Sequence, residues 1–90
     1  MRPEATVLRH VGRRIAELRV ARGWTQEAFA ELAGVSPGYV RQIEGGRGNL
    51  TLATAVRFAS LFGVDVVVLF TEPASAEVRR GRPPKAKRAG

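Results

Sequence analysis

The 90-residue sequence contains no cysteine and only one histidine. Without cysteine the chain can form neither disulfide bonds nor thiolate metal sites, and one histidine leaves few ligands for a metal ion, so no cofactor is expected. The longest uninterrupted apolar run, Val66 to Phe70, is far shorter than the roughly 20 residues of a membrane-spanning helix. The polar start MRPEATVLRH has no signal-peptide core. These absences predict a cytoplasmic protein with no membrane partner.

The sequence also lacks the patterns of catalytic sites, because it has no Ser/His/Asp set, no phosphate-binding loop and no metal-ligand spacing. We therefore do not expect an enzyme. What the sequence has is positive charge, with a formal net charge of +7. Residues 1–70 carry nine Lys/Arg against six Asp/Glu, and residues 71–90 carry six against two. This balance favours nucleic acid as the partner, although a solvated basic surface would have the same composition.

Residues 25–44, TQEAFAELAGVSPGYVRQIE, have the spacing of two short helices joined by a tight turn. Thr25 can cap the first helix, and Ser36 can cap the second, in which Pro37 occupies the first helical position. Gly34 can adopt the positive φ that ends one helix just before the next begins. The two predicted helices span residues 26–33 and 37–44. This segment is therefore predicted to be a helix-turn-helix.

Apolar residues at helical spacing predict two further helices. The first ends at Gly23 and has Leu8, Val11, Ile15 and Leu18 along one face. The other runs from a cap at Thr51 to Gly63 and is expected to bury Leu52, Ala55, Val56, Ala59 and Phe62. The segment VDVVVLF (64–70) fits either a strand or a short fifth helix. We expect residues 1–6 to be frayed, residues 7–70 to form the domain, and residues 71–90 to be a disordered basic tail.

The helix after Thr51 is apolar over a wider arc than one small core requires, because Phe58 and Leu61 are apolar as well. The surplus suggests a surface for a partner. If residues 64–70 form a strand, pairing with its copy in a second subunit would cover the exposed edge. We therefore predict a homodimer. Its interface is expected to include Phe58, Leu61, Phe62, Val66 and Val68.

From about Val11 to Phe70 the sequence resembles the Cro/repressor-type helix-turn-helix family, also called the xenobiotic-response-element family. The resemblance is carried by LR…GWTQEAFAELAGVSPGYVRQIEGG and by N-x-T-L at residues 49–52. It implies an all-α, compact four- to five-helix repressor-like domain that places helix 37–44 in the major groove of double-stranded DNA. Residues 49–70 also resemble small antitoxins that repress their own operons, which would make a toxin a second partner. Controller proteins of restriction–modification systems are similar too.

The resemblance implies which residues contact DNA. Base readout falls to helix 37–44, where Arg41 suits guanine and Gln42 suits adenine. Pro37 and Gly38 stand at the first two positions of that surface and have no side chain that hydrogen-bonds a base. Gln26 is expected to contact a phosphate at the N-terminal end of its helix. The other expected phosphate contacts are Thr25, Ser36, Tyr39, Arg47 and Asn49.

The tail contains Arg80-Gly81-Arg82-Pro83, which resembles an AT-hook, a peptide that lies in the narrow minor groove of A·T-rich DNA. The alternative is an unstructured basic tail that binds phosphates without regard to sequence. Three functions remain open. The first is a homodimeric transcriptional repressor, the second an autorepressing antitoxin, and the third an architectural protein that uses both grooves and prefers A·T-rich DNA. In each case the protein is expected in the cytoplasm, associated with the nucleoid.

Overall fold

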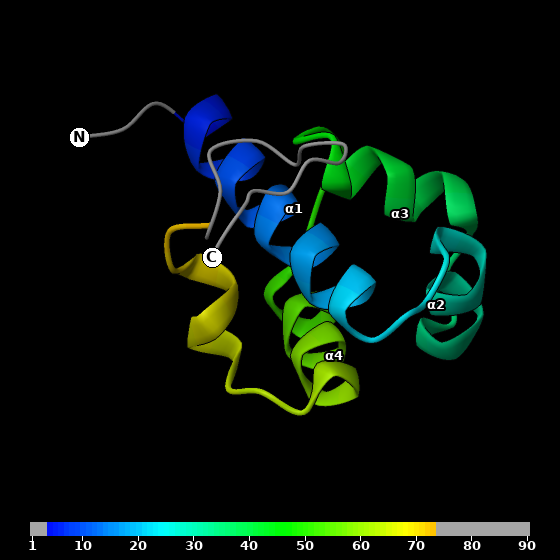
Figure 1. Ribbon diagram of the computed structural model, residues 1–90. Coiled ribbons are helices and arrows are strands. Elements are labelled where there is room, and N and C mark those ends of the chain that lie inside the picture. Colours follow the sequence, from blue (N-terminus) through cyan, green and yellow to red (C-terminus); the bar gives the residue numbers. More distant parts are fainter. Residues whose placement is uncertain (1–3, 74–90) are drawn as a thin grey trace, which may run out of the picture.

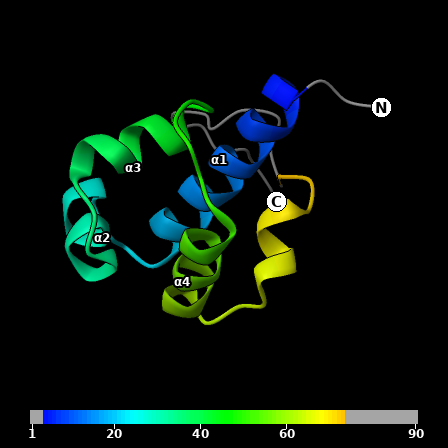
Figure 2. The same ribbon diagram turned by 180° about the vertical axis from the view of Figure 1, so that it is seen from behind.

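The computed structural model describes residues 4–73, and every regular element in this range is helical. The elements are α1 (Glu4–Ala21), α2 (Gln26–Ala33), α3 (Pro37–Glu44), α4 (Leu52–Phe62) and the 3-10 helix η1 (Val66–Phe70). Figure 1 shows α1 running through the middle of the molecule, with α2 and α3 together at one side. The opposite view in Figure 2 shows η1 beside α1, on the side away from α2 and α3. The predicted all-α helix-turn-helix fold is confirmed.

Local capping defines the helix-turn-helix corner. The Thr25 hydroxyl accepts a hydrogen bond from the backbone N–H of Ala28 at 2.9 Å, at the start of α2. The Ser36 hydroxyl accepts one from the N–H of Tyr39 at 3.0 Å, at the start of α3. Gly34 ends α2 with a φ of 74°, a conformation that residues with a Cβ rarely adopt. The predicted caps and turn are confirmed.

The core is built around a cluster of aromatic rings. Phe29 of α2 stacks on Phe62 of α4 with the ring centroids 5.0 Å apart, and it meets Phe58 edge-on at 4.8 Å. Trp24, which precedes α2, stacks against Phe29 at 6.0 Å. The largest fully buried side chains come from all five elements and are Ile15, Phe29, Val40, Phe58, Phe62 and Leu69. Close packing of this kind holds the α2–α3 corner rigidly on the rest of the domain.

The buried face of α4 differs from the sequence prediction. Leu52 and Val56 were predicted to be buried but are 69% and 46% exposed, whereas Phe58 and Phe62 are fully buried. The reason is that α4 packs against both α2 and η1 and therefore buries two adjoining strips of side chains. The assignment of Phe58 and Phe62 to a dimer interface is therefore wrong. Leu61 is half-buried against the same core.

Residues 66–70 form a 3-10 helix, so of the two alternatives for this segment the strand is wrong. The carboxylate of Asp65 caps the helix by accepting a hydrogen bond from a backbone N–H at 3.0 Å. Leu69 is fully buried, and the carbonyl of Val68 accepts a hydrogen bond from Nε of Arg14 at 3.3 Å. Residues 66–70 therefore pack and form hydrogen bonds within their own chain. The strand that was expected to pair across a dimer does not form here.

The first helix begins earlier in the sequence than predicted. α1 begins at Glu4, so the predicted fraying of residues 1–6 does not extend to residues 4–6. A glutamate in the first turn interacts favourably with the positive end of the helix dipole. The AT-hook-like motif Arg80–Pro83 lies outside the described residues and stays a prediction.

Candidate nucleic-acid interface

The outward face of α3 presents the two predicted base-reading side chains. Val40 and Ile43 are buried and attach α3 to the core. Because side chains three and four apart share a helix face, the intervening Arg41 and Gln42 point away from the core, and both are exposed. Pro37 and Gly38, at the start of α3, are half-buried, as is Tyr39. The structure therefore brings Arg41 and Gln42 together on one accessible surface.

Arg41 has a partner that the sequence analysis missed. Its Nη1 lies 3.6 Å from Oε2 of Glu27, in the first turn of α2, and the two side chains are 56% and 67% exposed. The pair therefore bridges the two helices of the corner on their solvent side. Its members are 14 residues apart in sequence, and no local spacing rule predicts such a contact.

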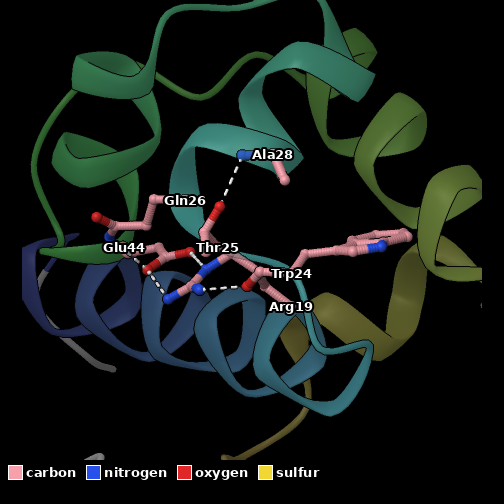
Figure 3. Close-up of polar contacts among 6 residues, drawn as sticks. All are labelled: Arg19, Trp24, Thr25, Gln26, Ala28 and Glu44. Carbon is pink, nitrogen blue, oxygen red and sulfur yellow. Dashed lines mark hydrogen bonds and ion pairs between the residues drawn. The ribbon is translucent and has the colours of Figure 1, made fainter.

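A second ion pair, between α1 and α3, is drawn in Figure 3 and is largely shielded from solvent. The carboxylate of Glu44 accepts hydrogen bonds from Nε of Arg19 at 2.7 Å and from its Nη2 at 3.1 Å. The Arg19 and Glu44 side chains are only 13% and 8% exposed. Nη1 of Arg19 also donates to the carbonyl of Trp24 at 2.8 Å. This network holds the end of α3 against α1 and against the entry to α2.

Gln26 belongs to the same network. Its Nε2 donates to Oε1 of Glu44 at 2.9 Å. This hydrogen bond orients the amide group with its nitrogen toward Glu44. The amide nitrogen carries a second N–H, and the first backbone N–H groups of α2 have no partner within the helix. This end of α2 can therefore donate hydrogen bonds to an anion such as a phosphate.

The remaining phosphate candidates surround the corner. The hydroxyls of Thr25 and Ser36 already accept hydrogen bonds as helix caps, and each retains an O–H donor. The Tyr39 hydroxyl donates to the carbonyl of Asn49 at 2.9 Å, so in this conformation its O–H is engaged within the protein. Arg47 is exposed in the glycine-rich loop after α3. Thr25, Ser36 and Tyr39 thus lie within the helix-turn-helix, whereas Arg47 and Asn49 lie in the loop that follows α3.

Several other arginines are used inside the fold. Arg22 and Arg57 donate to carbonyls at the C-terminal ends of α4 and α2, and Arg14 donates to a carbonyl of η1. Cations at these positions satisfy free carbonyls and offset the helix dipole. Residues 4–73 contain eight arginines and seven acidic residues, a formal balance of only +1. The excess charge of the chain therefore lies at Arg2 and in residues 74–90.

Two other kinds of feature are absent from residues 4–73. No helix there combines the length and the apolar character needed to cross a membrane. No three His, Asp or Glu side chains of this range gather where they could hold a metal ion.

Residues 15–69 match the sequence profile of a family described as helix-turn-helix. The chain is 43% identical over 56 residues to the HTH-type transcriptional regulator RamB of Mycobacterium tuberculosis, a match that spans 62% of this chain but 12% of RamB. It resembles the restriction–modification controller protein C.AhdI from Aeromonas hydrophila at a TM-score of 0.67 and 35% identity, over 70% of this chain and 96% of that one. A structure of the biofilm regulator SinR in complex with DNA is similar at a TM-score of 0.63 and 27% identity, over 68% and 98% of the two chains.

Proposed function

This chain belongs to the Cro/repressor-type helix-turn-helix family, and from that premise we propose that it is a transcriptional regulator that binds double-stranded DNA sequence-specifically. The observation that carries the proposal is the exposed pair Arg41 and Gln42 on a helix whose other side is packed into the core. An α-helix fits the major groove, where each base pair presents a distinct pattern of donors and acceptors. Arg41 would bind guanine O6 and N7, and Gln42 would bind adenine N6 and N7.

Contacts to the phosphates would set the register of α3 in the groove. Gln26 and the N-terminal N–H groups of α2 face one strand in this proposal, and Arg47 adds a cation at the far end of α3. Thr25, Ser36, Tyr39 and Asn49 are the further candidates. A protein that acts on the chromosome in this way would be located in the cytoplasm, associated with the nucleoid.

Replacing Arg41 with Ala tests the assignment of the reading surface. Removing a bidentate contact should weaken binding to the preferred duplex by about 1–3 kcal/mol and relax the base preference at one position. Replacing Gln26 with Ala should instead weaken binding to all sequences alike, because phosphates are the same in every sequence. The preferred duplex is obtained by selection from a randomised pool and by footprinting the protein's own promoter. An unchanged footprint and affinity for Arg41→Ala would show that the assigned reading surface is wrong.

We further propose that the regulator is a homodimeric repressor. Leu52 and Val56 lie one turn apart on α4, and their exposure supports an apolar contact with a second subunit. Three of the predicted interface residues remain partly exposed: Leu61, Val66 and Val68. In a symmetric dimer the two α3 helices would meet half-sites about 34–36 Å apart, which predicts a pseudo-palindromic operator.

Sedimentation of the chain at micromolar concentration tests the dimer. Replacing Val56 with Asp should shift the equilibrium toward monomer, because a carboxylate in an apolar contact loses its hydration. A native chain that sediments as a monomer and leaves an asymmetric footprint would rule the dimer out. The antitoxin alternative has lost its expected C-terminal strand, since residues 66–70 are helical.

A further inference from the structure

The exposed ion pair between Glu27 and Arg41 joins a residue of α2 to the side chain that we propose reads the bases. An exposed pair of this kind contributes little to the stability of a fold. The pair can, however, orient the guanidinium group of Arg41. The carboxylate of Glu27 approaches that group at Nη1, 3.6 Å away.

The position of the carboxylate leaves one edge of the guanidinium available. The group is planar and carries its N–H donors on Nε, Nη1 and Nη2. With Nη1 facing Glu27, the edge formed by Nε and Nη2 can still make the two parallel hydrogen bonds that guanine O6 and N7 accept. Gly38 borders this edge, because a Cβ at that residue would lie 3.9 Å from Nη2 of Arg41. No side chain of residue 38 therefore obstructs it.

We propose that Glu27 is a specificity-determining residue, which positions Arg41 for a base and restrains it from the phosphates. An arginine without this partner would bind phosphate oxygens of any sequence, because that attraction is independent of the bases. The negative charge of Glu27 also lies at the end of α2 where phosphates are expected to approach. The carboxylate thus lowers affinity for DNA in general and raises the preference for one base pair. This inference rests on the proposed role of Arg41 in reading DNA.

The test compares four variants of the 90-residue chain: Glu27→Gln, Glu31→Gln, Arg41→Ala and the double variant Glu27→Gln/Arg41→Ala. Glu31 is the matched control, because it is an exposed glutamate one turn further along α2, and within residues 4–73 no ion pair is found for it. Dissociation constants are measured for the duplex selected from a randomised pool, for its single-base variants and for a scrambled duplex. Circular dichroism verifies that each variant is folded.

We expect Glu27→Gln to reduce discrimination at the base pair read by Arg41 by up to about fivefold, the most that an exposed pair contributes. Affinity for the scrambled duplex should rise in both Glu→Gln variants, because each loses one negative charge. Discrimination should stay unchanged in Glu31→Gln. In the double variant it should equal that of Arg41→Ala, since Glu27 acts only through Arg41.

Two results would overturn the inference while leaving the proposed function intact. In one, Arg41→Ala relaxes base preference but Glu27→Gln does not. In the other, Glu31→Gln changes the preference as much as Glu27→Gln does, which would mean that charge alone is responsible. If Arg41→Ala itself leaves base preference unchanged, the proposed reading role fails and the role of Glu27 fails with it.

Discussion

At residue 12 the absence of a side chain determines how closely two helices approach. A Cβ on Gly12 would lie 2.1 Å from the carbonyl oxygen of Ile43 and 2.9 Å from that of Glu44. Both neighbours are backbone atoms, which cannot rotate away as the end of a side chain could. α1 can therefore contact the end of α3 directly only because residue 12 is glycine. The ion pair between Arg19 and Glu44 lies in the same contact between α1 and α3.

Replacing Gly12 with Ala should lower the free energy of unfolding by about 1–3 kcal/mol, because the added methyl group forces the helices apart. Alanine is the better helix former, so this decrease would occur against a propensity gain of about 1 kcal/mol. Gly38→Ala is the matched control, since a Cβ there would have no neighbour nearer than 3.9 Å. Urea denaturation measures both. Equal midpoints for Gly12→Ala and the native chain would contradict the close contact of α1 with α3.

Among the elements, α1, α2 and α3 are connected by one partly buried polar network. Arg19 comes from α1, Gln26 from α2 and Glu44 from α3, and their hydrogen bonds converge on the Glu44 carboxylate (Figure 3). A buried charge is tolerated only when it is paired and hydrogen-bonded. The network consequently requires one arrangement of the three helices, and it sets the angle at which α3 is presented.

Replacing Arg19 with Met should destabilise the domain by about 3–5 kcal/mol, because it leaves the carboxylate of Glu44 buried without a cation. Replacing both residues, as in Arg19→Met/Glu44→Leu, should recover much of that stability, since no unpaired charge then remains. Arg41→Met serves as the control. It removes the cation of an exposed pair and should change stability by no more than about 1 kcal/mol. Denaturation followed by Trp24 fluorescence would contradict this account if Arg19→Met and Arg41→Met had equal effects.

At the scale of the whole molecule, positive charge is distributed unevenly along the chain. The helical part, residues 4–73, is nearly neutral, and it uses several arginines to bind its own carbonyls and carboxylates. Six Lys/Arg lie in residues 79–90. Affinity for DNA backbone depends on the number of phosphates that are neutralised. We therefore expect the helical part to supply base readout and the tail to supply much of the general affinity.

Deleting residues 79–90 should leave the domain folded, because this segment, RRGRPPKAKRAG, has no large apolar side chain to contribute to a hydrophobic core. Affinity for DNA should fall, and its salt dependence should become shallower by about 0.9 in the log–log slope for each phosphate that the tail no longer neutralises. Circular dichroism and binding titrations at several salt concentrations measure the two effects. An unchanged salt slope would show that the tail does not contact DNA.

The variant Gly81→Ala/Arg82→Lys separates an AT-hook from a general basic tail, because it keeps the charge while it alters the fit to a narrow groove. If the tail is an AT-hook, this variant should lose its preference for A·T-rich flanks and bind G·C-rich flanks as before. Equal effects on both flanks would leave the tail as an electrostatic tether only.

Those properties of the protein that depend on near neighbours could be determined from the sequence alone. The caps at Thr25 and Ser36 and the turn at Gly34 were predictable, because each involves a hydrogen bond or a backbone angle within three residues. The exposure of Arg41 and Gln42 followed from the helical period once α3 was placed.

Tertiary structure alone decided the rest, because packing partners distant in sequence have no local signal. The buried face of α4 depends on both α2 and η1, so its apolar arc did not reveal that Phe58 would be buried and Leu52 exposed. The β-branched run at 66–70 became helical since Leu69 fits the core and Asp65 caps the turn. Likewise, the pairing of Arg19 with Glu44 joins residues 25 positions apart. Only the folded chain brings such charges within hydrogen-bonding distance.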